Sequence, residues 1–389
     1  MATLATRSAR SSVEPLCITA GCYEGGLYGW TTSCDAEGAV DTPELTWSFG
    51  AHIGAVKAVA VDEAGEILAT GGEDEYIKLY NLKTRTERGE LFQHKGSITA
   101  LAFFKSSHLL SASADGMVCI WRTHDWLCLH VLGGHKDAVT CLALHPSGRM
   151  ALSGSKDRTL RLWNLVEGRC AYITKPTFPK GAVIERVEWS PSGSFYAMAA
   201  GGTLHLFDAT QAGKPTPIAT HVQPQRINGG KFLSDAEFVF GGDDMCLQVL
   251  AVATGVVLRR IGTTGAAKAR IKDVSVVFRS PGATNPLVVS VTSTGGVHFW
   301  DLAKEGDGCL VASTAAPGSA SRLTCVTVSS VPHVVPRENA VAPKKRAAPV
   351  AQEEGEGAVE PKASHKPEEK ASPKVKSKKS KNFKGNASS

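Results

Sequence analysis

The sequence predicts an all-β fold built from repeated units, and three observations lead to this prediction. Segments of the 389-residue chain resemble one another at a spacing of 41 or 42 residues. Within each segment, short apolar runs alternate in the manner of half-buried strands, and glycine-rich turns separate them. Apolar residues make up 42% of the chain, which is ample for a buried core, yet no run approaches the length of a membrane-spanning segment.

The three clearest repeats begin at AHIGAV, QHKGSI and GHKDAV. Each has a histidine before its first strand, an aspartate in the turn before its third strand and an aromatic residue that closes that strand. These positions are His52, Asp74 and Tyr80, then His94, Asp115 and Trp121, then His135, Asp157 and Trp163. The pattern resembles the WD repeat, and the resemblance implies that each repeat is a four-stranded blade of a β-propeller.

The same resemblance implies a role for these side chains. In WD repeats the histidine, a strand hydroxyl, the turn aspartate and the closing tryptophan form a buried hydrogen-bond network. The matching hydroxyls here belong to Thr70, Ser111 and Ser153. Tryptophan only donates, a carboxylate only accepts, and histidine and serine do both, so such a chain can satisfy all its members. A catalytic triad would occur once and face a cleft, so three equally spaced copies favour the structural interpretation.

Weaker copies of the repeat extend the count to seven blades. Their closing positions fall at Trp30, Phe207, Val249 and Trp300. The first blade lacks an inner strand before Cys17, and a β-rich run at residues 322–330 follows the last blade. We expect this run to pair with the N-terminal strands and close the ring, which removes two exposed sheet edges. The first, fifth and seventh blades lack the turn aspartate, whereas the sixth keeps Asp243 without the hydroxyl or the tryptophan.

The chain divides into a leader (1–15), a propeller (16–330) and a tail (331–389). The tail has 13 Lys and Arg against 7 acidic residues, whereas the rest of the chain has 30 of each. Large apolar residues nearly vanish from the tail, so we expect it to be disordered. Its basic clusters are typical of nuclear import signals and of contacts with pre-rRNA phosphates, with a merely solubilising role as the alternative. The cationic residues of these clusters are Lys344, Lys345, Arg346, Lys374, Lys376, Lys378, Lys379, Lys381 and Lys384.

The leader lacks the apolar core of a secretory signal, and we interpret it as a disordered segment, with an organellar transit peptide as the alternative. The ten cysteines form no CxxC pair and lie mostly in strand-like runs, which favours small core residues in a reducing compartment. The sequence offers no metal-ligand spacing, no phosphate-binding loop and no unique nucleophile. We therefore predict an interaction platform without cofactor, metal or catalytic residues.

A candidate partner site follows from the order of the strands. The turns after the second and fourth strand of each blade should lie at one rim of a propeller. Four cationic residues of these turns would then form a basic patch on the best-conforming repeats, namely Lys95, Lys136, Lys156 and Arg158. A solvated surface without a partner is the alternative interpretation.

Some stretches of the sequence are less common among WD-repeat proteins and indicate a particular family. The stretches ITAGCYEGGLYGW, HPSGRMALSGSKDRTLRLWNLVEGRCAYI and RVEWSPSG, with the Lys-rich tail, resemble the PAK-interacting protein family over residues 16–330. This resemblance implies a nuclear, nucleolar scaffold for assembly of the large (60S) ribosomal subunit, with assembly factors and ribosomal-like proteins as partners. It also suggests negative regulation of a Rho-GTPase-activated kinase through the regulatory region of that kinase. A substrate receptor or chromatin adaptor is a third interpretation of a WD propeller. Closure of the ring favours a monomer, and the short apolar runs indicate no membrane contact.

Overall fold

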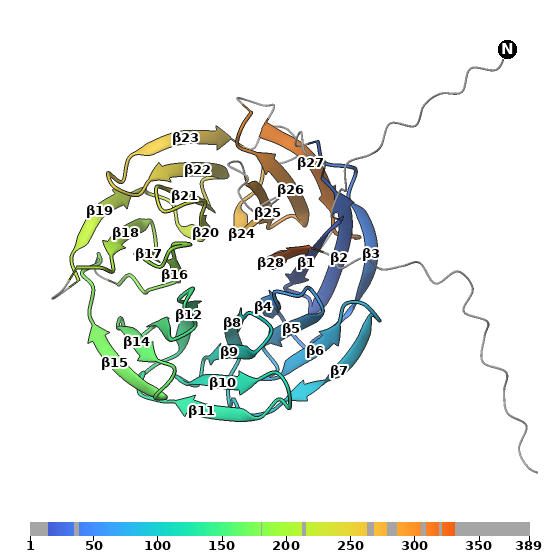
Figure 1. Ribbon diagram of the computed structural model, residues 1–389. Coiled ribbons are helices and arrows are strands. Elements are labelled where there is room, and N and C mark those ends of the chain that lie inside the picture. Colours follow the sequence, from blue (N-terminus) through green and yellow to red (C-terminus); the bar gives the residue numbers. More distant parts are fainter. Residues whose placement is uncertain are drawn as a thin grey trace, which may run out of the picture. The chain divides into compact units, whose positions relative to one another are not determined.

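The computed structural model of the protein describes residues 15–34, 39–179, 181–211, 215–262, 268–277, 286–304, 309–318 and 321–330. All of them belong to one compact unit. They form seven four-stranded antiparallel sheets, which are the blades of a β-propeller around a central channel (Figure 1). In this part of the chain no helix is long and apolar enough to cross a membrane. The predicted tail, residues 331–389, lies outside the described residues, as does the predicted leader except for Pro15, where the first strand begins.

The strands of each blade run in order from the channel to the outer edge of the ring. Blade 1 contains β28 (Leu323–Ser330), β1 (Pro15–Cys22), β2 (Gly26–Ser33) and β3 (Glu44–Gly50). Blades 2 to 4 contain β4 (Val56–Val61), β5 (Ile67–Gly72), β6 (Ile77–Asn81) and β7 (Thr86–Leu91); β8 (Ile98–Phe104), β9 (His108–Ser113), β10 (Val118–Arg122) and β11 (Cys128–Leu132); and β12 (Val139–Leu144), β13 (Met150–Ser155), β14 (Leu160–Asn164) and β15 (Arg169–Thr174).

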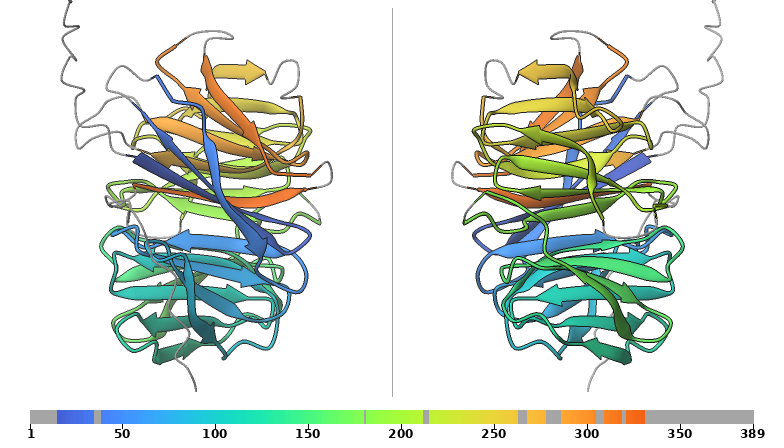
Figure 2. Two further views of the ribbon diagram at one scale, coloured as in Figure 1. Left: turned by 90° about the vertical axis from the view of Figure 1, so that its right-hand side faces the viewer. Right: turned by 90° about the vertical axis from the view of Figure 1, so that its left-hand side faces the viewer.

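The remaining blades repeat the same order. Blades 5 to 7 contain β16 (Arg186–Trp189), β17 (Phe195–Ala200), β18 (Thr203–Asp208) and β19 (Pro217–Val222); β20 (Ile227–Phe232), β21 (Glu237–Gly242), β22 (Cys246–Ala251) and β23 (Val257–Gly262); and β24 (Ile271–Val277), β25 (Leu287–Thr292), β26 (Gly296–Asp301) and β27 (Leu310–Ala315). Figure 2 shows the ring edge-on, with neighbouring blades packed face to face. This order confirms the predicted seven-bladed fold.

The last strand closes the ring, as predicted. Strand β28 pairs antiparallel with β1, with Thr19 opposite Thr327. Its neighbours across the blade faces also hold it, because the Thr324 hydroxyl donates to the carbonyl of Val56 in blade 2 and the Val326 N–H donates to Asp273 in blade 7 at 3.1 Å. The two ends of the propeller are therefore joined by backbone pairing and not only by side-chain packing.

The apolar core lies mainly between adjacent blades. Between blades 3 and 4, for example, Leu110 and Ile120 from one sheet pack with Val139 and Trp163 from the next. Strand residues alternate between the two faces of a blade, so each sheet contributes to the core on both sides. No blade buries its apolar face alone, which makes the ring the unit of stability.

One sequence assignment in blade 6 is wrong by one residue. The third strand of each blade has a β-bulge directly before its closing residue, and in β22 this bulge falls between Val249 and Leu250. The residue after the turn aspartate has a positive φ in blades 2 to 4, and in blade 6 that residue is Met245. The closing residue is therefore Leu250 instead of Val249, and the turn aspartate is Asp244 instead of Asp243. The sequence alone did not identify these positions, because two aspartates are adjacent in the turn and the closing residue is not aromatic.

Six of the ten cysteines are buried, and the other four are partly buried. Loss of hydration on burial raises the pKa of Cys141 to about 11 and that of Cys325 to about 12. The thiolate is the reactive form of cysteine, so these two groups are unreactive near neutral pH. Their role in the fold is that of small core residues.

Candidate partner-binding site

Blades 3 and 4 contain the four-residue network at the predicted positions. In blade 3, the Trp121 indole N–H donates to Ser111 Oγ at 2.9 Å, Ser111 Oγ lies 2.8 Å from His94 Nε2, and His94 Nδ1 lies 3.0 Å from Asp115. Blade 4 repeats this chain with the corresponding distances of 2.7, 2.8 and 3.1 Å. Its members are Trp163, Ser153, His135 and Asp157. The sequence spacing thus places all four side chains of each blade in one chain of hydrogen bonds.

Blade 2 contains a variant of the same network. His52 Nδ1 lies 2.8 Å from Asp74, and His52 Nε2 lies 2.8 Å from the Thr70 hydroxyl. The closing residue is Tyr80, which is 6% exposed and packs with Leu27 and Leu68 between blades 1 and 2. A phenol replaces the indole, and a threonine replaces the serine, while the position of the histidine and aspartate stays the same.

The donors and acceptors of the network are fixed by the protonation of the histidines. Burial lowers the pKa of His52, His94 and His135 below the ordinary histidine value, even though the neighbouring aspartates act in the opposite direction. A neutral ring donates from one nitrogen and accepts at the other. Because tryptophan can only donate to the serine, the serine hydroxyl donates to Nε2, and Nδ1–H donates to the carboxylate. Every buried polar atom of the complete network then has a partner.

The aspartates hold the loops of one rim in place. Asp115 accepts hydrogen bonds from the backbone N–H groups of Lys95 and Met117, at 2.9 and 2.8 Å. Burial alone would raise the pKa of Asp115, but these two N–H groups and the His94 ring outweigh it and lower the pKa. Asp157 binds the N–H groups of Lys136 and Thr159 in the same way, at 2.9 and 2.8 Å. The network therefore connects the sheet interior to the turns that carry the candidate partner residues.

The four predicted cationic residues lie on these turns and are exposed. Lys95 follows β7, Lys136 follows β11, and Lys156 and Arg158 lie in the turn between β13 and β14. Connections of these two kinds emerge at the same rim, and the Lys156 N–H donates to the carbonyl of Ala138 at 2.9 Å, which joins two of the turns. Within the described ranges, none of their four side-chain cations forms an ion pair with a carboxylate. The rim thus presents free positive charge beside blades 3 and 4.

The other blades lack the complete network. The position of the hydroxyl, two residues beyond the partner of the closing residue, is occupied by Ala20 in blade 1, Met198 in blade 5 and Phe240 in blade 6. Blade 7 keeps half of the network, because the Trp300 indole donates to Ser290 Oγ at 2.8 Å. The indole N–H of Trp30 in blade 1 is buried without a hydrogen-bond partner. The sequence analysis missed the Ser290 pair, although its ten-residue spacing to Trp300 is that of Ser111 to Trp121 and Ser153 to Trp163.

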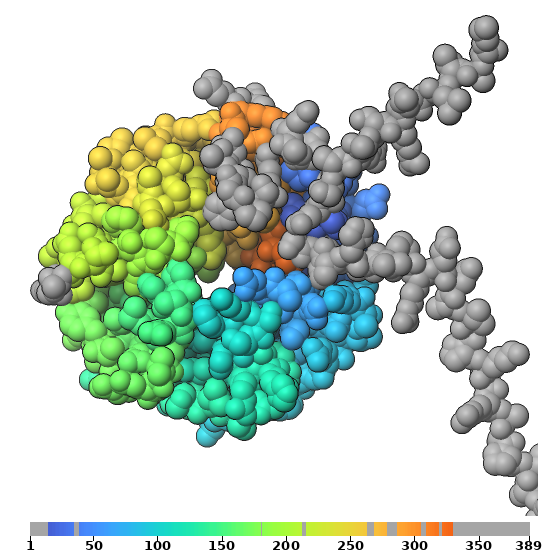
Figure 3. Space-filling view, viewed as in Figure 1, coloured from blue at the N-terminus to red at the C-terminus, as the bar shows by residue number. Residues whose placement is uncertain are grey.

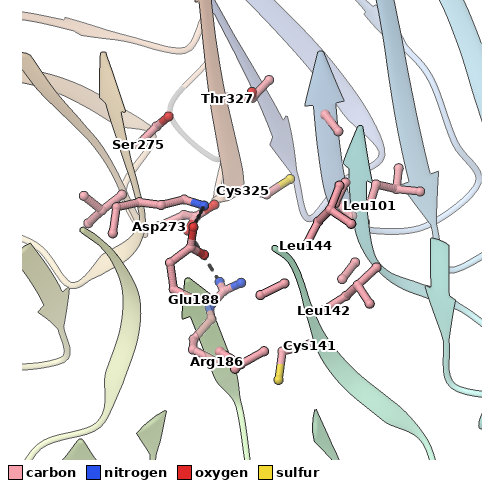
Figure 4. Close-up of a pocket in the computed structure, with 18 of the residues that line it drawn as sticks. Leu101, Cys141, Leu142, Leu144, Arg186, Glu188, Asp273, Ser275, Cys325 and Thr327 are labelled. Atoms are coloured by element: carbon pink, nitrogen blue, oxygen red, sulfur yellow. Dashed lines mark hydrogen bonds and ion pairs between the residues drawn. The ribbon is translucent and has the colours of Figure 1, made fainter. Parts of the chain in front are cut away.

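The central channel has two different sides, which the sequence did not predict. Its cavity of about 520 Å³ is lined by the inner strands of all seven blades, and Figure 3 shows its opening at the centre of one face. Figure 4 shows Leu101, Leu142 and Leu144 of blades 3 and 4 on one side. The other side carries charged residues of blades 5 to 7, and Figure 4 labels Arg186, Glu188 and Asp273 among them.

The channel charges of blades 5 to 7 are paired with one another. Lys231 Nζ donates to Glu188 Oε1 at 2.6 Å, and Arg186 lies 3.6 Å from Asp273. The first pair joins blades 5 and 6, and the second joins blades 5 and 7. These interactions neutralise the charged side of the channel and connect the inner strands, so the channel contributes to structure. The rim that carries Lys95 and Lys136, in contrast, combines cations that lack a carboxylate partner within the described ranges with turns held by the network aspartates.

Comparison with known proteins matches the repeats to one family model. The WD domain, G-beta repeat model matches residues 43–81, 85–122 and 126–164. Each match covers the outer strand of one blade and the three inner strands of the next. A propeller of such repeats is a protein-interaction fold.

Two relatives are similar in sequence to the chain over most of their length, and a third is similar over little more than a third of its length. The chain is 33% identical over 314 residues to "p21-activated protein kinase-interacting protein 1-like" of Xenopus laevis, covering 81% of this chain and 82% of the relative. It is 33% identical over 365 residues to the human protein "p21-activated protein kinase-interacting protein 1", covering 92% and 89%. It is 37% identical over 155 residues to "Protein MAK11" of Saccharomyces cerevisiae, covering 35% and 37%.

Proposed function

The chain belongs to the PAK-interacting protein family of WD-repeat proteins, and on this premise we propose that it is a non-catalytic scaffold for assembly of the large ribosomal subunit in the nucleolus. The propeller binds assembly factors and ribosomal-like proteins. The basic tail binds pre-rRNA or nuclear import receptors. The assembly role rests on the resemblance to the PAK-interacting protein family described above, which implies a scaffold for the large subunit.

The uneven charge of the chain is the observation that supports this division of labour best. Residues 331–389 contain 13 Lys and Arg against 7 acidic residues, and the remaining residues contain 30 of each. A neutral propeller has no general attraction for nucleic acid, whereas a Lys-rich segment gains affinity by releasing counterions from phosphates. The charge therefore favours protein contacts through the body and RNA or receptor contacts through the tail.

Burial of the network supports a non-catalytic role. Ser111 and Ser153, which a linear reading of His, Ser and Asp would make nucleophiles, are completely buried, and each accepts a hydrogen bond from a tryptophan. A nucleophile must reach a substrate in a cleft. These hydroxyls are instead internal parts of the blades.

Kinase regulation is a second candidate function. The relatives from Xenopus laevis and Homo sapiens are named for interaction with a p21-activated protein kinase. In this alternative the same propeller binds the regulatory region of such a kinase and inhibits it. The Lys-rich tail favours ribosome assembly, because docking to a kinase does not require a nucleic-acid-binding segment.

Affinity recovery of the tagged full chain at moderate salt, followed by sequencing of the bound RNA and identification of the bound proteins, tests the proposal. We expect precursor rRNA of the large subunit together with assembly factors. RNA recovery by the full chain should fall steeply as salt is raised, and a chain that ends at Val331 should lose the RNA while it keeps its protein partners. Recovery of a kinase or ubiquitin-ligase complex without RNA would contradict the proposed function.

A further inference from the structure

The rim held by the aspartate networks carries large apolar side chains in addition to its lysines. Ile53 is 89% exposed, Phe92 is 63% exposed, and Met117 and Tyr76 are 38% and 37% exposed. All four lie in turns between strands of blades 1 to 3, on the same rim as Lys95. Scattered exposed apolar residues need no explanation, but a contiguous row of them on turns indicates an interaction surface.

Contacts in the structure show that the row is contiguous across blade 2. Asp74 accepts hydrogen bonds from the backbone N–H groups of both Ile53 and Tyr76, at 3.0 and 3.5 Å, so these two residues are neighbours. The Tyr76 ring contacts the Phe92 ring edge-on with a centroid distance of 4.9 Å. Phe92 lies three residues before Lys95 in the turn between β7 and β8.

The row continues across blades 3 and 4. Lys95 and Met117 share the carboxylate of Asp115, as described above. A side chain built onto Gly133 would meet the Met117 sulfur at 3.0 Å, so Met117 extends to the turn that carries Lys136. We call this surface the rim strip, and its members are Ile53, Tyr76, Phe92, Lys95, Met117, Lys136, Lys156 and Arg158.

The rim strip changes from apolar to basic along its length, and equivalent positions of the repeat show this change. The residue after the network histidine is Ile53 in blade 2, Lys95 in blade 3 and Lys136 in blade 4. The strip is therefore apolar at blade 2, mixed at blade 3 and basic at blade 4. Three exposed acidic residues lie in the turns beside it: Glu73, which pairs with Lys57, and Glu75 and Asp137, neither of which is ion-paired within the described ranges.

We propose that the rim strip binds an acidic protein segment that carries bulky apolar side chains at one end, so that these cover blade 2 while its carboxylates reach the lysines of blades 3 and 4. Charge complementarity selects an acidic partner, and burial of Ile53 and Phe92 supplies the apolar contribution. The backbone N–H bonds to the network aspartates fix the turns before binding, which reduces the entropy lost on association. This inference rests on the proposed function only in assuming that the propeller binds proteins.

An RNA strand fits the strip less well. RNA phosphates would suit the lysines of blades 3 and 4, and Phe92 and Tyr76 can stack on bases. The aliphatic side chains of Ile53, the most exposed of the strip's apolar side chains, and of Met117 offer neither a stacking surface nor a hydrogen bond to a nucleotide. A protein segment uses both ends of the strip. The strip therefore favours protein over RNA as its occupant.

Fluorescence anisotropy with the full chain tests the inference, and the probe is a labelled peptide with an Asp- and Glu-rich half followed by a Leu- and Phe-rich half. We expect this block peptide to bind about tenfold or more tightly than a peptide of the same composition in which acidic and apolar residues alternate. Ile53→Asp with Phe92→Asp, and separately Lys95→Glu with Lys136→Glu, should each weaken binding by about tenfold or more. Equal affinity for the two peptides would overturn the inference.

Matched controls separate a specific site from general charge. Lys105→Glu with Arg149→Glu reverses two exposed cations in turns of the opposite rim and should leave peptide binding unchanged. Thermal unfolding checks that each variant is folded, because the substituted side chains take no part in the networks. Tighter binding of oligouridylate than of the block peptide, lost in the same variants, would identify an RNA site and overturn the inference. Absence of peptide binding while the unmodified chain still recovers precursor rRNA would overturn the inference and leave the proposed function standing.

Discussion

Blades 2 to 4 and blades 5 to 7 share one strand plan but are stabilised by different interactions. In blades 2 to 4, buried networks join a histidine, a hydroxyl and an aspartate, and the channel side is largely apolar. In blades 5 and 6, Met198 and Phe240 fill the place of the hydroxyl and are fully buried. Ion pairs across the channel connect these blades and blade 7 through their inner strands.

The difference shows that the network is not required to form a blade. All seven blades have strand pairing and packing against their neighbours. The hydrogen-bond network, where it is present, also holds the rim turns in place. Where the network is present, the turn aspartate binds the backbone of two rim residues. The rim strip lies on the blades that contain the network, so we infer that the network serves to hold the binding surface. In blades 5 and 6, where apolar side chains replace the hydroxyl, these side chains serve packing alone.

Removal of the strand that joins the two regions should have the largest effect. Strand β28 lies between β24 of blade 7 and β4 of blade 2 and pairs with β1. A chain that ends at Ser321 leaves the backbone of β1 unpaired and the ring open, so we expect loss of cooperative folding. Thermal unfolding compares this chain with one that ends at Val331. Equal melting temperatures for the two chains would show that closure is unnecessary.

The next largest effect should come from removing a turn aspartate, and it should be larger in a blade with the complete network than in blade 6. Asp115→Ala removes the acceptor of two backbone N–H groups and of the His94 ring, and we expect a loss of about 2–4 kcal/mol in the free energy of unfolding. Asp244→Ala in blade 6 removes one of two acceptors of the buried Gln248 amide, which keeps its bond to Gln223, together with a long bond from the Cys246 N–H and the partner of the exposed Arg260. We therefore expect a smaller loss of about 1 kcal/mol. Urea denaturation measures both, and equal losses would remove the distinction between the two regions.

Acidification should destabilise the protein below pH 6.5. Burial lowers the pKa of the three network histidines and of His221 and His298, so the unfolded chain binds these protons first as pH falls. Stability is therefore complete above pH 6.5 and declines as the pH falls toward the lower folded values. The lowered pKa of Asp115 adds a further loss below about 3.8. Urea denaturation between pH 7.5 and 5 should show this decline.

A network variant sharpens this pH prediction. His94→Gln removes one of the titrating groups, so its stability should be lower at pH 7.5 but should decline less steeply on acidification. His130→Gln is the matched control, because His130 is an exposed residue of an outer strand. An unchanged pH slope in the His94 variant would show that the network does not titrate with folding.

The smallest effect is expected in the channel. Lys231 and Glu188 are 41% and 26% exposed, and exposed ion pairs contribute little. Lys231→Met should therefore change the free energy of unfolding by less than about 1 kcal/mol. A loss larger than that of Asp115→Ala would mean that the channel ion pairs stabilise the fold more than the rim networks do.

The sequence predicted those features whose residues recur at a fixed spacing. The networks of blades 2 to 4 were accessible because His, Asp and an aromatic residue repeat together, and the closing strand was accessible because the first blade lacked a partner for Cys17. Blade 6 was assigned one residue early because Leu250 has no ring to mark the closing position. The channel pair of Arg186 and Asp273 depends on blades that are distant in sequence, so no local pattern reveals it.

The rim strip could be predicted from the sequence only in part. Its lysines were identified from the sequence, but its apolar end was not, although aligning the residue after each network histidine places Ile53 with Lys95 and Lys136. The alignment does not give exposure, because the sequence pattern does not distinguish a buried apolar residue in a turn from an exposed one. The contact of Tyr76 with Phe92 and the 89% exposure of Ile53 required the folded chain.

The central claim is that the networked rim binds protein partners while the tail accounts for RNA. The most direct test recovers the tagged chain with Lys95, Lys136, Lys156 and Arg158 all changed to Glu, and compares its proteins and RNA with those of the unmodified chain. We expect loss of assembly proteins with retention of tail-dependent RNA. An unchanged set of protein partners would contradict it.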